Sequence, residues 1–373
     1  MVKFKGEKFM VKFGTIALGI TLAVSACAFT ACGKTSGDEG TSVVETIQDV
    51  DNIILVIGDG MGENHILNAI EYFDLDIPVF MEDQKGYIRT DSIGSVTDSA
   101  AAGTALATGK KVVNGNIAQF GGQDLTQITT LAKEAGKKTG VVTTDTLCGA
   151  TPAAFSAHAP NRDMVDEIVA TQLESDVDLF IGQSHEAYLE NKSSFEEKGY
   201  AFASSVAELE NAKESEKLVA VLPEVGSEYI VGNEEDYQLK EMAKFAVEYL
   251  QNDNGFFLMI EGAYIDKYSH NNDLRGAMCE VRSLFNTISY LYGYAEDGNT
   301  AILITADHET GGLYKIKEGD IFSNSLYTST GHTGTNVPVF TKNCRFDITE
   351  FGYGTSAIPQ NTVIFDVCKS LLK

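Results

Sequence analysis

Residues 52–62 have the sequence NIILVIGDGMG, in which a run of β-branched and aliphatic side chains leads into a glycine-rich turn that carries Asp59. The run predicts a strand over Asn52–Ile57, and the amphipathic stretch that follows predicts a helix over Glu63–Tyr72. Alternation of this kind is typical of strand, helix, strand units on a mostly parallel sheet. This stretch therefore indicates an α/β fold.

The same alternation continues along the chain. Further β-branched runs predict strands over Lys138–Thr143, Val177–Ile181, Leu218–Leu222, Phe256–Ile260, Thr300–Thr305 and Val337–Thr341. Further amphipathic or alanine-rich stretches predict helices over Ser99–Thr108, Leu125–Ala135, Arg162–Leu173, Asp236–Gln251 and Asp273–Tyr292. We expect a three-layer α/β sandwich, with helices flanking a central, mostly parallel sheet. Residues 51–373 are expected to form one domain, with a surface insertion near residues 183–235.

The N-terminal segment differs in composition from the rest of the chain. A lysine-rich start followed by a short apolar stretch predicts a signal peptide over residues 1–26, and a polar linker follows over residues 27–50. Cys27 and Cys32 both follow small residues, as in bacterial lipoprotein signals, and the aliphatic Val24 favours lipidation at Cys27. Cleavage without lipidation stays open as the alternative. We expect an exported, extracytoplasmic protein, anchored to the cell membrane by lipid.

The charge of the chain restricts its partners. The formal net charge of −25 disfavours nucleic acid, because binding a phosphate backbone requires clustered Lys and Arg. Most of the acidic residues are expected on solvated faces. The acidity is also compatible with cation binding.

Acidic residues follow three of the predicted strands at the points where the strands end. Asp59 follows the first strand, Glu261 follows FFLMI with Asp266 just beyond, and Asp307-His308 follows TAILITA. Ligands of open α/β sheets bind outside the carboxyl ends of the strands. We therefore expect these acids to converge although they lie far apart in the sequence.

The spacing and the residue types indicate a divalent metal. Asp266 and His270 are four positions apart, so one helical turn places both on the same face. His332, in the glycine-rich GHTGT segment, is a further candidate ligand. Carboxylates combined with imidazoles, without thiolates, favour zinc or another divalent metal in a catalytic site over a closed structural zinc site.

Ser99 lies in VTDSAAAGTALATGKK, residues 96–111, either as a helix start or as a nucleophile. A dinucleotide loop at residues 58–63 is disfavoured, because Glu63 replaces the last glycine of GxGxxG and its charge would repel a pyrophosphate. A Ser-His-Asp hydrolase is disfavoured too, because no glycine flanks Ser99 at the elbow positions. Activation of the serine by a metal explains the pattern better.

From about Asn52 onward the chain resembles the alkaline phosphatases. The resemblance rests on VTDSAAAGT, NIILVIGDGMG, EGAYIDKYSH, TADHETGG and GHTG. It implies one zinc held by Asp266, His270 and His332, a second zinc held by Asp59, Asp307 and His308 that also binds the Ser99 oxygen, and a magnesium held by Asp59, Glu261 and Thr151. It also implies that Arg162 clamps the phosphate through two parallel hydrogen bonds, which a lysine cannot form.

The resemblance implies hydrolysis of small phosphate monoesters through a phosphoserine on Ser99, with a homodimer as the assembly. The charges agree with this chemistry, because four ligand carboxylates would repel a phosphate ester unless cations reverse the sign of the site. Two alternatives stay open. One is a phosphodiesterase of the same superfamily, and the other, from a different class, is a solute-binding lipoprotein.

Gly149 departs from the family pattern. The family carries Asp or His two positions before the threonine that corresponds to Thr151, so we expect a weakened or altered magnesium site in this chain. The resemblance also makes Lys267 a substrate-binding residue that pairs with the acid missing here, so Lys267 is expected to lack its partner. On this basis Gly149→Asp should raise the affinity for magnesium.

Overall fold

The computed structural model describes residues 50–223, 225–227, 239–317, 319–346 and 357–372. The expected signal peptide, Cys27, Cys32 and nearly all of the linker lie outside these residues. The described residues belong to one compact unit. None of the described helices has both the length and the apolar character needed to cross a membrane.

A mostly parallel sheet forms the centre of the molecule. Within the described residues its nine strands lie in the order β2 (Gln84–Ile88), β13 (Val337–Lys342), β10 (Thr300–Thr305), β1 (Asn52–Gly58), β9 (Phe256–Gly262), β5 (Lys138–Thr146), β6 (Leu179–Gln183), β8 (Lys217–Leu222) and β7 (Tyr200–Ala203). The strands from β10 to β7 are parallel to one another, β13 is antiparallel to β10, and β2 is antiparallel to β13. Two short two-stranded sheets pair β11 (Glu309–Thr310) with β12 (His332–Thr333) and β3 (Gln119–Phe120) with β4 (Gln123–Asp124).

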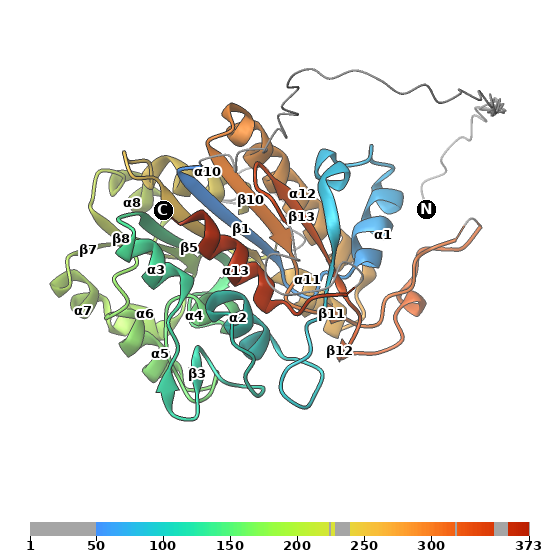
Figure 1. Ribbon diagram of the computed structural model, residues 1–373, viewed down its shortest axis with the longest axis horizontal. Coiled ribbons are helices and arrows are strands. Elements are labelled where there is room, and N and C mark those ends of the chain that lie inside the picture. The colour runs from blue at the N-terminus through green and yellow to red at the C-terminus, as the bar shows by residue number, and fades with distance from the viewer. Residues whose placement is uncertain (1–49, 224, 228–238, 318, 347–356, 373) are drawn as a thin grey trace, which may run out of the picture. The chain divides into compact units, whose positions relative to one another are not determined.

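Helices form two groups, one in front of the sheet and one behind it in Figure 1. The first group is α2 (Ser99–Thr108), α3 (Ile128–Glu134), α4 (Ala150–Ala154) and α13 (Thr362–Leu371), and the second is α1 (Glu63–Phe73), α10 (Leu239–Tyr249), α11 (Tyr264–His270) and α12 (Leu274–Tyr294). Toward the β7 edge lie α5 (Val165–Gln172), α6 (Glu186–Glu190), α7 (Lys192–Glu197) and α8 (Val206–Asn211). The expected α/β sandwich is confirmed.

The strand register positions the acids. Ile57 of β1 lies opposite Glu261 of β9 on one side and Thr305 of β10 on the other. Strands β9 and β10 are buried along their whole length, as expected where both faces of a parallel sheet are covered. Asp59, Glu261 and Asp307 therefore all lie at the carboxyl edge of three neighbouring strands.

The helix α2 has the bounds expected from the sequence, and all ten of its residues are buried. The Asp98 carboxylate caps it by accepting a hydrogen bond from the Ala101 N–H at 2.9 Å. A Cβ on Gly103 would lie 3.1 Å from the Ala154 Cβ, so the small residue permits close packing of α2 on α4. Ser99 is thus the first residue of a rigid, capped helix.

The expected surface insertion at residues 183–235 contributes two strands, β7 and β8, to the central sheet. β8 matches the strand expected over Leu218–Leu222, whereas β7 was not expected, because it is a short run between charged helices. Two helices begin later than expected, α5 at Val165 and α3 at Ile128. The residues before them belong to loops, in which the Arg162 N–H donates to the Gly115 carbonyl and the Leu125 N–H to the Ala118 carbonyl.

Candidate active site

The candidate site lies at the carboxyl edge of the sheet, where β1, β9 and β10 end side by side. The Asp59 N–H donates to the Gly262 carbonyl, and the Gly60 N–H donates to Asp307 Oδ1, both at 3.1 Å. Gly60 has a φ of +74°, and a Cβ there would lie 2.9 Å from the Asp266 Cα. The turn after β1 therefore needs glycine, both for its backbone conformation and for the close approach of Asp266.

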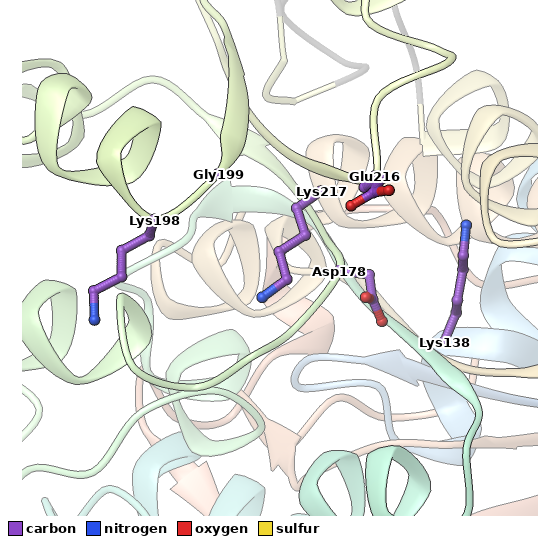
Figure 2. Close-up of a pocket in the computed structure, with 6 residues that line it drawn as sticks. All are labelled: Lys138, Asp178, Lys198, Gly199, Glu216 and Lys217. Atoms are coloured by element: carbon purple, nitrogen blue, oxygen red, sulfur yellow. The ribbon is translucent and has the colours of Figure 1, made fainter.

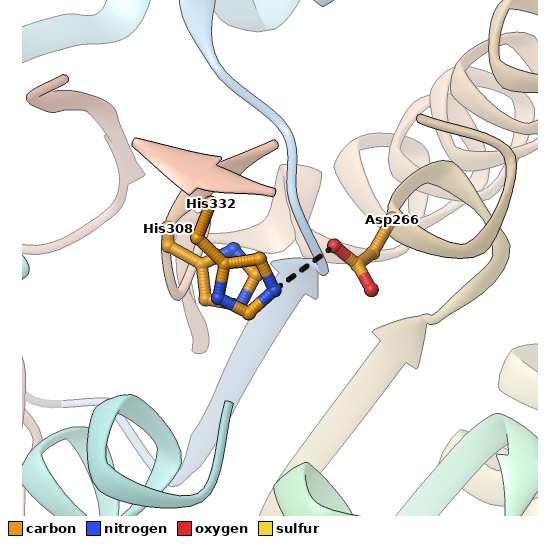
Figure 3. Close-up of side chains that lie close together, drawn as sticks. All are labelled: Asp266, His308 and His332. Atoms are coloured by element: carbon orange, nitrogen blue, oxygen red, sulfur yellow. Dashed lines mark ion pairs between the residues drawn. The ribbon is translucent and has the colours of Figure 1, made fainter. Parts of the chain in front are cut away.

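One cluster combines Asp266, His270 and His332. The His270 Nε2 atom lies 3.3 Å from Asp266 Oδ2 and 3.1 Å from the His332 Nε2 atom. The His332 Nε2 atom lies 3.5 Å from Asp266 Oδ1, the pair joined by the dashed line in Figure 3. The structure thus brings together the three residues expected to hold the first zinc.

A second cluster combines Asp59, Asp307 and His308. The His308 Nε2 atom lies 3.1 Å from Asp307 Oδ2 and 3.6 Å from Asp59 Oδ1. The rings of His308 and His332 stack with their centroids 3.5 Å apart, so the two clusters adjoin (Figure 3). Asp266, His308 and His332 also lie close enough together to share an ion.

Hydrogen bonds orient the three imidazoles. The Nδ1–H groups of His270 and His332 donate to the carbonyls of Thr330 and Thr97, at 2.5 and 2.8 Å. The Thr310 hydroxyl donates to Asp266 Oδ1 at 2.5 Å, which leaves its oxygen to accept from His308 Nδ1 at 3.2 Å. In all three residues Nε2 therefore faces the cluster and, once deprotonated, offers its lone pair there, the arrangement of histidine ligands whose second nitrogen is held by a partner.

Three buried oxygens of the expected ligands accept or donate no hydrogen bond among the described residues: Asp59 Oδ1, Asp307 Oδ2 and Thr151 Oγ1. Buried polar atoms are nearly always satisfied, and a buried carboxylate oxygen without a partner is costly. Divalent cations bound by oxygen and Nε2 would satisfy these atoms. The donor set of mixed carboxylates and imidazoles fits zinc, so the residues present fit the metals.

The clusters retain protons when no cation is bound. Burial, with the negative charges of Asp307, Asp266 and Glu261, raises the pKa of Asp59 well above its usual range. Burial and the carboxylate of Asp145 raise the pKa of Glu261 to about 8. The hydrogen bond with Asp266 raises the pKa of His270 to about 9 despite partial burial. Protons or cations must therefore balance the carboxylates near neutral pH.

Ser99 lies at the second cluster. Its Oγ atom is 3.2 Å from His308 Nε2, and the residue is 5% exposed. The contact superficially resembles part of a Ser-His-Asp triad. However, the Nδ1 of His308 bonds to a threonine rather than to a carboxylate, and its Nε2 also faces Asp59 and Asp307. This geometry suits a shared metal better than a triad.

Arg162 lies beside the start of α2. Its Nη1 atom is 3.5 Å from Asp98 Oδ2, and its side chain is partly exposed. Asp98 also accepts hydrogen bonds from the N–H groups of Ala101 and Gly115, so its carboxylate both caps the helix and holds the guanidinium. The sequence analysis did not identify this second role; the adjacency of Asp98 to Ser99 was the available signal.

Glu261 and Thr151 are both buried, on β9 and α4. Each is 1% exposed. The Thr143 hydroxyl, which faces Glu261 across the β5–β9 pair, donates to Glu261 Oε2. Thr151 belongs to α4, which contacts both β5 and β9. The expected magnesium ligands therefore come from adjoining elements.

Lys267 does have a partner, contrary to expectation. Its Nζ atom lies 2.5 Å from Asp145 Oδ1 and 4.4 Å from the centroid of the Tyr264 ring. Asp145 lies near the end of β5, four positions before Gly149. The glycine at position 149 predicted that the acidic partner of Lys267 is missing, but the carboxylate of Asp145 occupies the space beside Gly149.

A separate cavity of about 470 Å³ lies at the opposite edge of the sheet, lined by Lys138, Asp178, Lys198, Gly199, Glu216 and Lys217 (Figure 2). It lies by the amino ends of β5, β6 and β8. Its charged residues form ion pairs: the buried Asp178 accepts from Lys133 at 2.8 Å, and the exposed Lys198 donates to Glu174 at 2.7 Å. Neither a nucleophile nor a histidine lines it, so the candidate site remains at the carboxyl edge.

Comparison with known proteins agrees with this geometry. A family model described as alkaline phosphatase matches residues 50–180 and 182–343. Alkaline phosphatase 4 of Bacillus subtilis is 32% identical over 71% of this chain and 62% of its own length, so the chain spans less than two thirds of that relative. Alkaline phosphatase 3 of the same organism is 31% identical over 85% of this chain and 73% of its own length.

Solved structures agree as well. The alkaline phosphatase of the Antarctic bacterium TAB5 superposes with a TM-score of 0.75 at 27% identity, covering 87% of this chain and 98% of that one. A variant of that protein, described with Mg bound in its M3 site, superposes with a TM-score of 0.74 at 28% identity, covering 87% of this chain and 99% of that one.

Proposed function

This chain belongs to the alkaline phosphatase family, and we propose that it hydrolyses small phosphate monoesters with Ser99 as the nucleophile. The observation that carries the proposal is the 3.2 Å contact between Ser99 Oγ and His308 Nε2. It joins a hydroxyl at a helix start to a cluster of carboxylate and imidazole donors that fits divalent metals. Family membership is independent support.

The metal ligands are proposed as the resemblance assigns them. Asp266, His270 and His332 would hold one zinc, Asp59, Asp307 and His308 a second, and Asp59, Glu261 and Thr151 a magnesium. When bound, these ions supply positive charge for the phosphate and lower the pKa of a nearby hydroxyl. The structure of a TAB5 alkaline phosphatase variant with Mg bound in its M3 site supports the proposed magnesium site.

The chain's own residues carry out the bond changes. Ser99 Oγ loses its proton and attacks phosphorus, the bond to the ester oxygen breaks, and the alcohol leaves with a proton from water. Water then attacks the phosphoserine, the bond to Oγ breaks, and inorganic phosphate leaves as Ser99 regains a proton. The N-terminus of α2 helps to bind the phosphate, because free N–H groups and the positive end of the helix favour an anion there.

Arg162 is proposed to bind the phosphate and Lys267 to contact it through water. We expect Arg162→Ala to raise KM for p-nitrophenyl phosphate, and the inhibition constant of inorganic phosphate, by about tenfold to a hundredfold, because a charge-assisted pair of hydrogen bonds is lost. Steady-state kinetics measure both constants. Arg162→Lys should fall between, and Arg89→Ala, at an exposed arginine directly after β2, should leave both unchanged. An unaltered phosphate inhibition constant in Arg162→Ala would contradict the assignment.

The function itself is tested by assaying p-nitrophenyl phosphate and its bis ester with and without a chelator. We expect monoester hydrolysis that the chelator abolishes and that zinc with magnesium restores. Faster cleavage of the bis ester would favour the phosphodiesterase alternative. Absence of turnover in the metal-loaded protein would favour the solute-binding alternative.

Alkaline phosphatases are typically extracytoplasmic, and we propose the same location for this protein. Lipidation at Cys27, after removal of residues 1–26, would anchor it to the cell membrane. We further propose that residues 51–373 form one catalytic domain and that the protein acts as a homodimer. The anchor is checked by mass spectrometry of the N-terminal peptide, and the dimer by analytical ultracentrifugation.

A further inference from the structure

Asp145 occupies the space that a side chain on residue 149 would need. A Cβ built on Gly149 would lie 2.9 Å from Asp145 Oδ2 and 3.0 Å from the Thr146 carbonyl oxygen. Gly149 has φ −54° and ψ 153°, a conformation open to any residue. Glycine is therefore needed here for space and not for backbone freedom, and the space belongs to a carboxylate.

Hydrogen bonds connect Asp145 to Glu261. The Asp145 N–H donates to Thr143 Oγ1 at 2.9 Å, and the Thr143 hydroxyl in turn donates to Glu261 Oε2. On its other side, Asp145 Oδ1 accepts from Lys267 Nζ at 2.5 Å. The ion pair with Lys267 uses Oδ1, so Asp145 Oδ2, the oxygen beside Gly149, is not part of that pair.

Unpartnered oxygens lie on the elements around this carboxylate. The Thr151 hydroxyl, two residues after Gly149, is buried and forms no hydrogen bond among the described residues. Asp59 Oδ1, beyond the strand that pairs with β9, is buried and unpartnered as well. Oxygen donors of this kind, carboxylates with one hydroxyl, suit magnesium, which prefers hard ligands and keeps several of its waters.

We propose that Asp145 supplies the carboxylate that residue 149 lacks: it binds Mg²⁺ together with Glu261 and Thr151, and it holds Lys267 beside them. This inference rests on the proposed function, because the magnesium site belongs to the same catalytic centre. It reverses the expectation drawn from Gly149 alone. The chain keeps a full set of acidic groups at this site, with one of them moved four positions toward the N-terminus.

The test is a calorimetric titration of the zinc-loaded enzyme with Mg²⁺, together with the Mg²⁺-dependent rise in Tm. We expect Asp145→Asn to weaken Mg²⁺ binding about tenfold to a hundredfold, the range found when residues that support a metal site are removed. The matched control is Asp163→Asn, at an exposed aspartate, which should bind Mg²⁺ like the wild type.

Lys267→Met distinguishes direct binding of Mg²⁺ by Asp145 from an effect of Asp145 that acts only through Lys267. If Asp145 binds the cation, loss of the competing positive charge should leave Mg²⁺ affinity unchanged or increase it. A loss equal to that of Asp145→Asn would mean that Asp145 acts only by holding Lys267, and would overturn the inference.

Gly149→Asp gives an independent readout if Asp145→Asn does not fold. The added Cβ would displace the Asp145 carboxylate, so Mg²⁺ affinity should not rise. A rise would overturn the inference, as would wild-type affinity in a folded Asp145→Asn. Each of these results leaves zinc-dependent monoester hydrolysis by the wild type intact, whereas absence of that hydrolysis would overturn the proposed function itself.

Discussion

Ser99→Ala is expected to lower kcat for p-nitrophenyl phosphate by at least about a thousandfold, because removal of a catalytic nucleophile costs up to about a millionfold. The variant should keep its zinc content and Tm. Alanine suits the buried first turn of α2, and the cap from Asp98 to the Ala101 N–H does not involve the serine side chain. Steady-state kinetics measure the loss, and metal analysis measures the zinc content.

A second readout identifies the covalent step. Acid quenching of wild-type enzyme during turnover should trap a phosphoserine at residue 99, detected by peptide mass spectrometry and absent from Ser99→Ala. The matched control is Ser95→Ala, at an exposed serine four positions earlier, which should retain wild-type kinetics. Substantial turnover by Ser99→Ala, or a phosphoserine elsewhere, would show that another group attacks phosphorus.

Asp307→Asn is expected to weaken zinc binding at least about a hundredfold. Removal of a residue that only supports a metal ligand already lowers metal affinity by up to about a hundredfold, and Asp307 is proposed as a ligand itself. Activity should fall with the zinc content. Asp307 is fully buried, and its Oδ1 accepts hydrogen bonds from the N–H groups of Gly60 and His308, which an asparagine oxygen can replace. Its Oδ2 faces His308 Nε2 at 3.1 Å within the cluster, and the substitution removes the negative charge at this position.

The same substitution should stabilise the metal-free protein. Burial and the Asp307 charge are the leading causes that raise the pKa of Asp59. A carboxyl whose pKa is raised by folding contributes stability at low pH, and that contribution is lost as the pH rises toward the folded-state pKa. The metal-free wild type should therefore lose stability with rising pH, and Asp307→Asn should lose less.

Thermal unfolding of metal-free and zinc-loaded protein, followed across pH, distinguishes these effects. We expect Asp307→Asn to have the higher Tm without metal and the lower Tm with zinc. Asp253→Asn, at an exposed aspartate, should match the wild type in both states. Wild-type zinc content and turnover in Asp307→Asn would contradict its assignment as a ligand.

Much of the fold and of the candidate site could be predicted from local sequence patterns. Buried parallel strands are continuous apolar runs, so β1, β9 and β10 were identified nearly at their true bounds. Because the acids follow those strands directly, their meeting at one sheet edge followed from topology. By contrast, the short strand β7 lies between charged helices and was not expected, and the chain around it resembled a surface insertion although β8 was predicted there.

The sequence by itself determined the kinds of donor in the site, their places at strand ends, and a serine at the start of an alanine-rich helix. Only the tertiary structure decided which nitrogen each histidine presents and that Asp98 holds Arg162. It also showed that Asp145, 122 positions from Lys267 along the chain, fills the space over Gly149. The physical reason is that periodicity and motifs describe neighbours along the chain, whereas charge balance and packing depend on which atom occupies a volume, whatever its position in the sequence.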